Sequence, residues 1–505
     1  MNNFLNGLTN ATNFTHTENG AITHKSTGTA LLDMFALGGA YRKRSEEDVI
    51  VLFKNAYAED AYMARKCLFY LRDVRGGQGE RRFFRVCLKW LANNDPDVVV
   101  ANIENIVEYG RYDDWYVLLD TPVKNVVLSA IKCQLGIDVQ SNTPSLLAKW
   151  LPSENTSSKV TRHTANIIRN YLGLSHKQYR KTLSILRGRI RVLEKLMSAN
   201  RWDEIEFDKI PSKAGIKYKN AFARRDFTKA RYEAFAKSTE TKVNAKTLYP
   251  YEVVAEALKL FRTGYYSSAK MPALDNVDRL MVNKYWENLA DYFNGSTLNA
   301  LAVVDTSGSM VSSEASAPIN VAISLGLYCA EKAKGPFAGH YVSFASRPQL
   351  IKTEGVDFAD KVFRIYKTNL VDNTNIEATF DLLLDTAIRN HCPQSDLPEN
   401  IIIISDMEFD AARRDRYDYW NRNLSNQATL MESIERKWNA HGYKMPKLIF
   451  WNVDARKNNI PMTVKDGISF VSGMSPTIFK QIMSGKTAYD LMYEVLNQER
   501  YNAIQ

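Results

Sequence analysis

The sequence predicts an α + α/β protein, in which an N-terminal domain of helical repeats precedes a doubly wound, mainly parallel sheet. Apolar residues recur every three or four positions from about Ala30 to Ala290, and short strands alternate with helices after about Gly295. With 505 residues the chain is long enough for about two to four domains. The expected divisions are an N-terminal arm over residues 1–30, a helical-repeat domain over 31–294 and an α/β domain over 295–505.

The helical half consists of short amphipathic segments joined by brief polar turns. No run of alternating β-branched residues and no exact repeat occurs there, but helices of this length and density are typical of a degenerate helical-repeat array. Residues 1–30 show no clear period, so we expect an extended or poorly ordered arm. The expected helices cover residues 49–71, 81–92, 98–108, 113–119, 123–135, 145–151, 160–172, 176–199 and 253–263.

The α/β half alternates strands and helices, and the change of character falls near residues 291–297. The segment Asn400–Ser405 is apolar throughout its centre, as a strand buried on both faces should be. The expected strands cover residues 298–304, 341–345, 400–405, 447–453 and 467–473, with a candidate partner strand at 349–353. The expected helices cover residues 319–333, 376–390, 428–440, 476–483 and 488–498.

The composition is that of a globular protein, with 45% hydrophobic and 24% charged residues. No segment reaches the roughly 18 apolar residues of a membrane-spanning helix, and the N-terminus lacks the pattern of a secretory signal. The cysteines are scattered and form no CxxC pair, which predicts reduced thiols, no zinc site and a cytoplasmic protein. They are Cys67, Cys87, Cys133, Cys329 and Cys392.

Positive charge is concentrated in one stretch of the chain. The formal net charge is +10, and residues 151–250 hold 22 of the basic residues against 9 acidic ones. Such asymmetry indicates either a polyanionic partner, most often nucleic acid, or a solvated basic face. Charge alone favours neither interpretation.

Within this stretch, residues 176–197 place leucine and isoleucine on one helix face and leave arginines on the others. Tyr171 and Tyr179 are interleaved with the basic residues. Because arginine binds phosphate with a planar fork and tyrosine stacks on unpaired bases, RNA binding is one hypothesis for this stretch. Its candidate residues are Arg162, Arg169, His176, Lys177, Arg180, Lys181, Arg187 and Arg191.

The string Asp305-Thr-Ser307-Gly-Ser309 directly follows the first expected strand of the sheet. Open α/β sheets bind ligands outside the carboxyl ends of their strands, and a turn there can aim alternate side chains at one point. One carboxylate and two hydroxyls make a hard oxygen set that suits Mg²⁺. Alone, the string is equally compatible with a polar turn, because Asp, Ser and Gly are common turn residues.

Two further loops strengthen the metal interpretation. Thr374 follows a polar turn and precedes an expected helix, and Asp406 ends the strand NIIIIS. This three-part pattern resembles the metal-ion-dependent adhesion site of von Willebrand factor A domains. The resemblance implies that Asp305, Ser307, Ser309, Thr374 and Asp406 bind Mg²⁺ or another divalent cation.

In that family the site binds rather than catalyses, and a carboxylate from a partner often completes the coordination. Glu408 and Asp410 lie close to the third loop in sequence. We expect them to be surface groups or groups that lie behind the ligands.

Strings in the helical half also resemble a known family. They are Arg72-Asp-Val-Arg-Gly-Gly-Gln-Gly-Glu-Arg81, Tyr109-Gly-Arg-Tyr-Asp-Asp-Trp115, Ile210-Pro-Ser-Lys and Ala221-Phe-Ala-Arg-Arg-Asp226. In this order they resemble the TROVE module of Ro autoantigen proteins. They match more closely an uncharacterised relative of that family, which joins a TROVE-like helical half to a von Willebrand A half. The resemblance extends from about residue 30 to 500.

This resemblance implies HEAT-like helical repeats that bind RNA, because Ro-type rings bind structured RNA and the single-stranded ends of misfolded RNA. Phosphate contact and base stacking would then provide the binding. Relatives occur in cells and in viruses, so a role in a virion stays open.

The glycine-rich turn at residues 76–79 is compatible with two arrangements. It could cradle a phosphate at a helix start, but no Gly-Lys-Ser/Thr follows, so it is not a nucleotide-binding P-loop. A tight connection between helices is favoured. In that arrangement arginines of the string pair with acids of the next turn, whereas the alternative is contact with RNA. These arginines are Arg75, Arg81 and Arg82, and the acids are Asp113 and Asp114.

No catalytic set is visible in the sequence. The seven histidines form no HExxH or HxH pattern, and no GxSxG elbow occurs, so we expect no enzymatic activity. Two functions remain. The first is a Ro-like RNA-binding scaffold whose A domain docks a partner through Mg²⁺. The second is a protein-interaction or assembly component, in which the metal site holds a partner's carboxylate.

Overall fold

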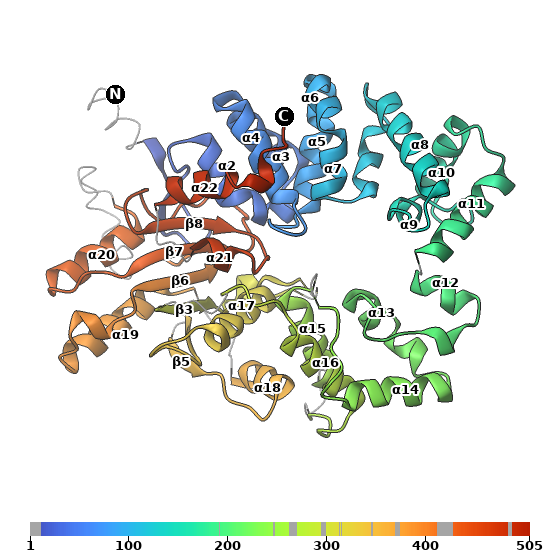
Figure 1. Ribbon diagram of the computed structural model, residues 1–505. Helices are drawn as coiled ribbons and strands as arrows, with labels where there is room; N and C mark the ends of the chain where they lie inside the picture. Colours follow the sequence, from blue (N-terminus) through green and yellow to red (C-terminus); the bar gives the residue numbers. More distant parts are fainter. Residues whose placement is uncertain are drawn as a thin grey trace. The chain divides into compact units, whose positions relative to one another are not determined.

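The computed structural model describes residues 12–190, 192–245, 248–261, 270–293, 299–312, 314, 316–344, 347–368, 374–411, 428–482 and 487–505 (Figure 1). The chain forms two compact units, and neither is continuous in sequence. The sheet unit comprises Met1–Cys67 and Leu248–Gln498, and the helical unit comprises Leu68–Thr247 and Glu499–Gln505. Residues of the predicted helical-repeat domain, 31–294, therefore contribute to both units.

The sheet unit is built around six strands. They are β3 (Ala300–Asp305), β4 (His340–Phe344), β5 (Gln349–Lys352), β6 (Asn400–Ser405), β7 (Lys447–Asn452) and β8 (Ile468–Ser472). Their order is β5-β4-β3-β6-β7-β8. All neighbours are parallel except β4 and β5, which confirms the predicted mainly parallel sheet. The order reverses between β3 and β6, so the ligand-binding crevice of such a sheet is expected at the carboxyl ends of these two strands.

Apolar residues explain the central position of these strands. Every residue of β3 and of β6 is buried, as their apolar strings predict. Helix α17 (Pro318–Lys332) packs directly on β3. A Cβ on Gly326 of this helix would lie 2.4 Å from Cγ2 of Val304, so the close approach of helix to strand requires glycine there.

The remaining helices of the C-terminal segment follow the expected order. They are α18 (Phe358–Thr368), α19 (Ile376–Arg389), α20 (Leu430–Ala440), α21 (Ile478–Ile482) and α22 (Ala488–Leu496). Only α18 was not predicted from the sequence, although its buried residues Phe358, Val362 and Ile365 have helical spacing.

Helices that precede and follow the helical unit in sequence complete the sheet unit. They are α2 (Ala30–Leu37), α3 (Glu46–Glu59), α15 (Pro250–Phe261) and α16 (Val277–Glu287). Helix α2 contacts β8, although the two are far apart in sequence, and the blue α2 lies near the red β8 in Figure 1. Helix α15 packs against α17. Their apolar faces need the sheet for burial, which explains why the compact units interleave along the chain.

The part of the predicted N-terminal arm that the structure describes, residues 12–30, includes two short strands. Strands β1 (Phe14–His16) and β2 (Ile22–His24) form an antiparallel hairpin. His24 exchanges two backbone hydrogen bonds with Ile460, at 2.9 and 3.0 Å. Periodicity does not predict this hairpin, because its strands are three residues long and are stabilised by contacts with distant segments.

The helical unit confirms most of the predicted helices. The helices of this unit are α4 (Ala61–Arg72), which spans the division between the units, α5 (Arg81–Asn94), α6 (Pro96–Ala101), α7 (Ile103–Tyr109), η2 (Tyr112–Leu118), α8 (Lys124–Gln140), α9 (Leu147–Trp150), α10 (Lys159–Tyr171), α11 (His176–Arg189), α12 (Leu193–Ser198), η3 (Trp202–Glu204), α13 (Ser212–Phe222) and α14 (Asp226–Lys237). The segment 49–71 breaks because Asp60 ends α3 and its carboxylate accepts the Met63 amide at 2.9 Å. Helices α13 and α14 were not predicted from the sequence.

The first two of the four strings that carry the family resemblance, Arg72–Arg81 and Tyr109–Trp115, pack on each other within the helical unit. Both Nε and Nη2 of Arg72 donate to Oδ2 of Asp114, at 2.9 and 2.7 Å. Arg85 donates to the other oxygen at 2.6 Å. The side chains of Arg72 and Asp114 are 2% and 0% exposed, so this ion pair is fully desolvated.

The expected pairing between the strings is therefore present, but Arg72 and Arg85 make it in place of the arginines named from the sequence. Arg75 pairs with Glu108 at 3.4 Å instead. Spacing in the sequence could not distinguish these arginines, because the choice depends on which helix face meets the second string.

The glycine-rich turn is a tight connection between α4 and α5. A Cβ on Gly77 would lie 2.0 Å from the carbonyl oxygen of Tyr70, and Gly79 has a φ of 66°. The amides of both glycines donate to the carbonyl oxygen of Asp73, at 3.2 and 3.0 Å. These amides are committed within the turn, which supports the connector interpretation over a phosphate cradle.

The C-terminal residues hold this turn from outside. Nη2 of Arg500 donates to the buried carboxylate of Asp73 at 2.7 Å, and the Tyr501 hydroxyl donates to it at 3.1 Å. The ion pair raises the pKa of Arg500 above its ordinary value. The ring of Tyr501 stacks on Tyr109 with centroids 5.7 Å apart.

Candidate functional site

The first and third predicted metal loops meet at the carboxyl ends of β3 and β6. Asp305 is the last residue of β3, and Asp406 directly follows β6. The Ser307 and Ser309 hydroxyls lie 3.0 Å apart. The Ser309 hydroxyl donates to Oδ2 of Asp406 at 2.8 Å. Because β3 and β6 are neighbours at the reversal of strand order, the sheet itself brings these four side chains together.

The second loop is tied to the third. Thr374 is 2% exposed, and its carbonyl oxygen accepts the Asp410 amide at 2.9 Å. The Asn19 side-chain amide donates both to the Thr374 hydroxyl at 3.3 Å and to the Glu408 carbonyl at 2.6 Å. Thr374 is therefore tied to the loop that follows Asp406, the third predicted metal loop.

The two carboxylates of this site are buried almost completely. Asp305 is 0% exposed and Asp406 is 1% exposed. Burial and then the charge of Asp406 raise the pKa of Asp305 to about 7, although hydrogen bonds from Ser405 and Ser307 oppose the shift. The Ser405 hydroxyl donates to Oδ2 of Asp305 at 2.5 Å. Two buried carboxylates that face each other are the environment that a cation would stabilise.

Arg456 is a neighbour of the site that was not identified from the sequence. Its Nη2 donates to Oδ2 of Asp406 at 2.6 Å, and Asp406 contributes to raising the pKa of Arg456. Nothing in the sequence around Arg456 marks it, because it reaches Asp406 from the loop after β7.

Glu408 is fully buried and is not a surface group. Its Oε2 accepts the backbone amide of Glu18 at 2.6 Å. Burial raises the pKa of Glu408 above its ordinary value. The N-terminal hairpin therefore contacts the third metal loop through the buried Glu408 carboxylate.

The donor set fits a hard divalent cation. It consists of two carboxylates and three hydroxyls, which are the oxygen ligands that Mg²⁺ accepts. In the parts of the chain that the structure describes, no cluster of three or more His, Cys, Asp or Glu side chains could hold a metal ion. The predicted set at the carboxyl ends of β3 and β6 contains only two acids. A cation bound there would therefore depend on the hydroxyls of Ser307, Ser309 and Thr374 as well as on Asp305 and Asp406.

Three of the predicted RNA-binding residues converge on one acid. Glu154, whose side chain is 8% exposed, lies 3.0 Å from Nε of Arg169 and 2.7 Å from Nδ1 of His176. Nη1 of Arg180 lies 4.0 Å from its other oxygen. Part of the positive charge predicted to face RNA is therefore balanced within the helical unit.

Two other predicted RNA contacts are occupied by backbone carbonyls. Arg187 donates to the carbonyls of Ala148 and Leu151 at 2.8 and 2.7 Å. Arg162 donates to the carbonyls of Thr156 and Ser157. These arginines fasten the loops around α9 and before α10.

The tyrosines of the basic stretch differ from each other. Tyr179 is 1% exposed and donates to the Pro152 carbonyl at 2.9 Å, so the prediction that it stacks on bases is wrong. Its apolar ring belongs to the buried face of α11, which the spacing of Leu183 and Leu186 already indicated. Tyr171 is 39% exposed.

Exposed positive charge remains along α11. Lys177, Arg180 and Lys181 are all exposed, and the two lysines stand one helical turn apart. Arg191, the last member of the predicted set, lies outside the described residues.

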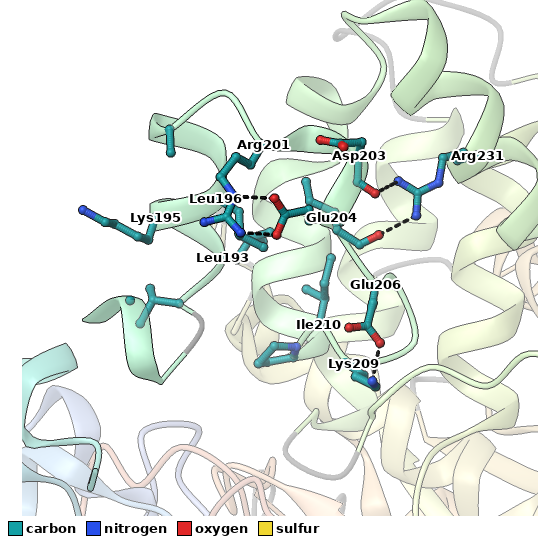
Figure 2. Close-up of a pocket in the computed structure, with 15 residues that line it drawn as sticks. Leu193, Lys195, Leu196, Arg201, Asp203, Glu204, Glu206, Lys209, Ile210 and Arg231 are labelled. Carbon is teal, nitrogen blue, oxygen red and sulfur yellow. Dashed lines mark hydrogen bonds and ion pairs between the residues drawn. The ribbon is translucent and has the colours of Figure 1, made fainter. Parts of the chain in front are cut away.

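The helical unit also contains a cavity of about 600 Å³ near α12 and η3. Figure 2 shows two ion pairs in its wall: Arg201 pairs with Glu204, and Lys209 pairs with Glu206. Arg231 donates to the carbonyls of Asp203 and Ile205 at 2.7 and 2.8 Å. The remaining wall is formed by apolar residues such as Leu193, Leu196 and Ile210.

The cysteines agree with the expectation of reduced thiols. Cys67, Cys133, Cys329 and Cys392 are free thiols, and Cys67, Cys87 and Cys329 are buried. Burial raises the pKa of the Cys67 thiol well above its ordinary value. No helix among the described residues has the length and apolar character needed to cross a membrane.

Two comparisons decide the family. A family model described as a domain of unknown function (DUF2828) matches residues 17–117 and 133–296, which is more than half of the chain. The chain belongs to the DUF2828 family. An uncharacterized protein, L728 of Acanthamoeba polyphaga mimivirus, is 31% identical over 520 residues, covering 94% of this chain and 85% of the viral protein. The DUF2828 match begins inside the N-terminal hairpin and includes helices of both compact units.

A second model, also described as a domain of unknown function (DUF7788), matches residues 299–503 of this DUF2828 protein. This segment contains all six strands of the sheet. Among solved structures, the Ro (RSR) protein of Deinococcus radiodurans is similar at a TM-score of 0.45 and 12% identity, covering 91% of this chain and 100% of that one.

Proposed function

We propose that this DUF2828 protein is a non-enzymatic binding scaffold that holds a divalent cation, Mg²⁺ in the first place, at the carboxyl edge of its sheet. The observation that supports this function is the convergence of Asp305, Ser307, Ser309 and Asp406 at the reversal of strand order. Thr374 is tied to the same loop as Asp406 through the Asp410 amide. A bound cation would supply positive charge, and a carboxylate of a protein partner would complete its coordination. The strand order and the three ligand loops also favour a von Willebrand A-type domain.

The roles of the five residues follow from their positions. Asp305 and Asp406 would balance the charge of the cation, since they are the two acids of the donor set. Ser307, Ser309 and Thr374 would provide neutral oxygen ligands and leave room for water or a partner's carboxylate. Because hydroxyl ligands are neutral, Asp305 and Asp406 are the only members of the donor set that would repel a partner's carboxylate.

Thermal unfolding tests this function directly. A ligand that binds only the folded state stabilises it by about 2.7 kcal/mol when present at 100 times its Kd. We expect millimolar MgCl₂ to raise the Tm of the full chain, and NaCl of equal ionic strength to leave it unchanged. Equal melting temperatures in both salts would refute the cation site.

A second candidate function is RNA binding by the helical unit. The specific observation that favours it is the exposed set Lys177, Arg180 and Lys181 on α11, within the most basic stretch of the chain. Phosphate contacts by such residues give an affinity that falls steeply with salt. Arg162 and Arg187 would then be structural residues, since their donors are used inside the unit.

For this candidate we expect a 20-nucleotide oligouridylate to bind at low salt. Removal of one phosphate-binding lysine reduces the slope of log affinity against log salt by about one, so Lys177→Glu combined with Lys181→Glu should weaken binding at least tenfold. The control combines Lys89→Glu with Lys132→Glu, because these lysines are also exposed and lie on α5 and α8. Failure of the wild-type protein to bind at about 50 mM salt, or equal binding by both variants, would refute RNA binding through α11.

A further inference from the structure

The turn between β1 and β2 lies on two of the three metal loops. Asn19 contacts both the Thr374 hydroxyl and the Glu408 carbonyl, and the Ala411 amide donates to the Asn19 carbonyl at 3.1 Å. The Thr17 hydroxyl donates to the Phe409 carbonyl at 2.7 Å. These contacts place an element from the start of the chain at a site whose predicted ligands all come from its C-terminal part.

The same turn brings a carboxylate to Arg456. Oε2 of Glu18 lies 2.9 Å from Nη1 of Arg456, whose Nη2 contacts Asp406 at 2.6 Å. One guanidinium therefore joins a predicted cation ligand to an acidic side chain of the hairpin. The Glu18 and Arg456 side chains are 39% and 31% exposed, so solvent and other molecules can reach this contact.

An exposed ion pair of this kind is easily exchanged. Partly exposed pairs contribute about 0–1 kcal/mol, whereas the buried Asp406 and Glu408 anchors are inaccessible. The hairpin keeps its other attachments when Glu18 leaves Arg456, because His24 bonds to Ile460 and Thr17 bonds to Phe409. Glu18 can therefore be replaced at Arg456 without unfolding of β1 and β2.

We propose that Arg456 recognises the acidic side chain of a protein partner beside the cation, and that Glu18 occupies Arg456 as an internal competitor until the partner displaces it. The inference rests on the proposed cation function. It makes Arg456 the residue that selects an acidic partner and Glu18 the residue that regulates access to Arg456. Arg456 suits this role because a guanidinium binds a carboxylate through a planar fork. The apparent dissociation constant for the partner equals the intrinsic constant divided by the fraction of molecules in which Glu18 has left Arg456.

Hexaglutamate in the presence of Mg²⁺ is the probe that tests this inference, with calorimetry of the full chain as the measurement. Glu18→Gln should tighten hexaglutamate binding about fivefold, which corresponds to Glu18 occupying Arg456 in about 80% of molecules. Arg456→Gln should weaken it about tenfold, and the double variant should behave as Arg456→Gln alone. Mg²⁺ binding itself, measured without peptide, should remain in Glu18→Gln, because the Glu18 carboxylate pairs with Arg456.

Glu435→Gln is the matched control, since Glu435 is a glutamate of the sheet unit that pairs with Lys465. It should bind hexaglutamate as the wild type does. Unchanged peptide affinity in Glu18→Gln, or no peptide binding by any variant while Mg²⁺ still binds, overturns this inference and leaves the cation site intact. Absence of Mg²⁺ binding in the wild type overturns both.

Discussion

Replacing Asp114 with alanine should lower the free energy of unfolding of the helical unit by about 3–5 kcal/mol. The carboxylate accepts from Arg72, from Arg85 and from the Arg111 amide, at 2.6–2.9 Å. Arg72 is 2% exposed, so the variant leaves a guanidinium buried without its counter-charge. The free energy of unfolding can be measured by urea denaturation with tryptophan fluorescence as the probe, because Trp115 lies next to Asp114.

Two variants distinguish this cause from a general loss of packing. Arg72→Met combined with Asp114→Leu removes both charges and keeps apolar volume, and it should cost far less than Asp114→Ala alone. Asp113→Ala, on the same turn, removes a carboxylate that is 17% exposed and should cost less than Asp114→Ala. Equal losses for Asp113→Ala and Asp114→Ala would show that burial of the ion pair is not the cause.

Asp305→Asn should abolish the stabilisation by Mg²⁺ and, in metal-free buffer, should make the protein more stable at about pH 8 than the wild type. Burial and Asp406 raise the pKa of Asp305 from 3.8 to about 7. A raised carboxyl pKa gives a contribution to stability that is present below the unfolded pKa and is lost as the pH rises through the folded pKa. Asparagine carries no such charge, so the advantage of the variant should grow between about pH 4 and pH 8.

The measurement is urea denaturation on the acid and the alkaline side of the folded pKa, at about pH 5 and pH 8, with and without MgCl₂. Asp381→Asn is a control, since Asp381 is 33% exposed and pairs with Lys437 away from the metal loops. It should keep the full response to Mg²⁺. A Mg²⁺ response that persists in Asp305→Asn would show that the cation binds elsewhere.

The fold of the sheet was accessible from the sequence because its signals are local. β6 coincides with the expected strand at residues 400–405, since its run of isoleucines favours a strand buried on both faces. The division into two compact units could not be predicted from the sequence. Helix α2 has an apolar face that shows it must pack, but nothing local shows that it packs on β8, at the other end of the chain.

The predicted ligands could be identified from the sequence for the same reason, since Asp305 and Asp406 each lie at the end of an apolar strand. The residues around these ligands could not be identified in this way. Glu18 and Asn19 lie in a polar segment without periodicity, and Arg456 has no distinctive neighbours. The charge pattern of the helical unit was a poor guide to individual RNA-binding residues, because the number of arginines does not reveal that Arg187 donates to backbone carbonyls.

The central claim is that Asp305, Ser307, Ser309, Thr374 and Asp406 form one cation site, and anomalous diffraction from crystals grown with Mn²⁺ tests it most directly. Mn²⁺ shares the preference of Mg²⁺ for oxygen ligands and scatters anomalously. We expect an anomalous peak at the carboxyl ends of β3 and β6. The peak should lie near the Ser307 and Ser309 hydroxyls, at about the 2.0–2.1 Å that is typical of Mg²⁺ coordination. A crystal saturated with Mn²⁺ that shows no peak there, or a peak only at other carboxylates, would contradict the claim.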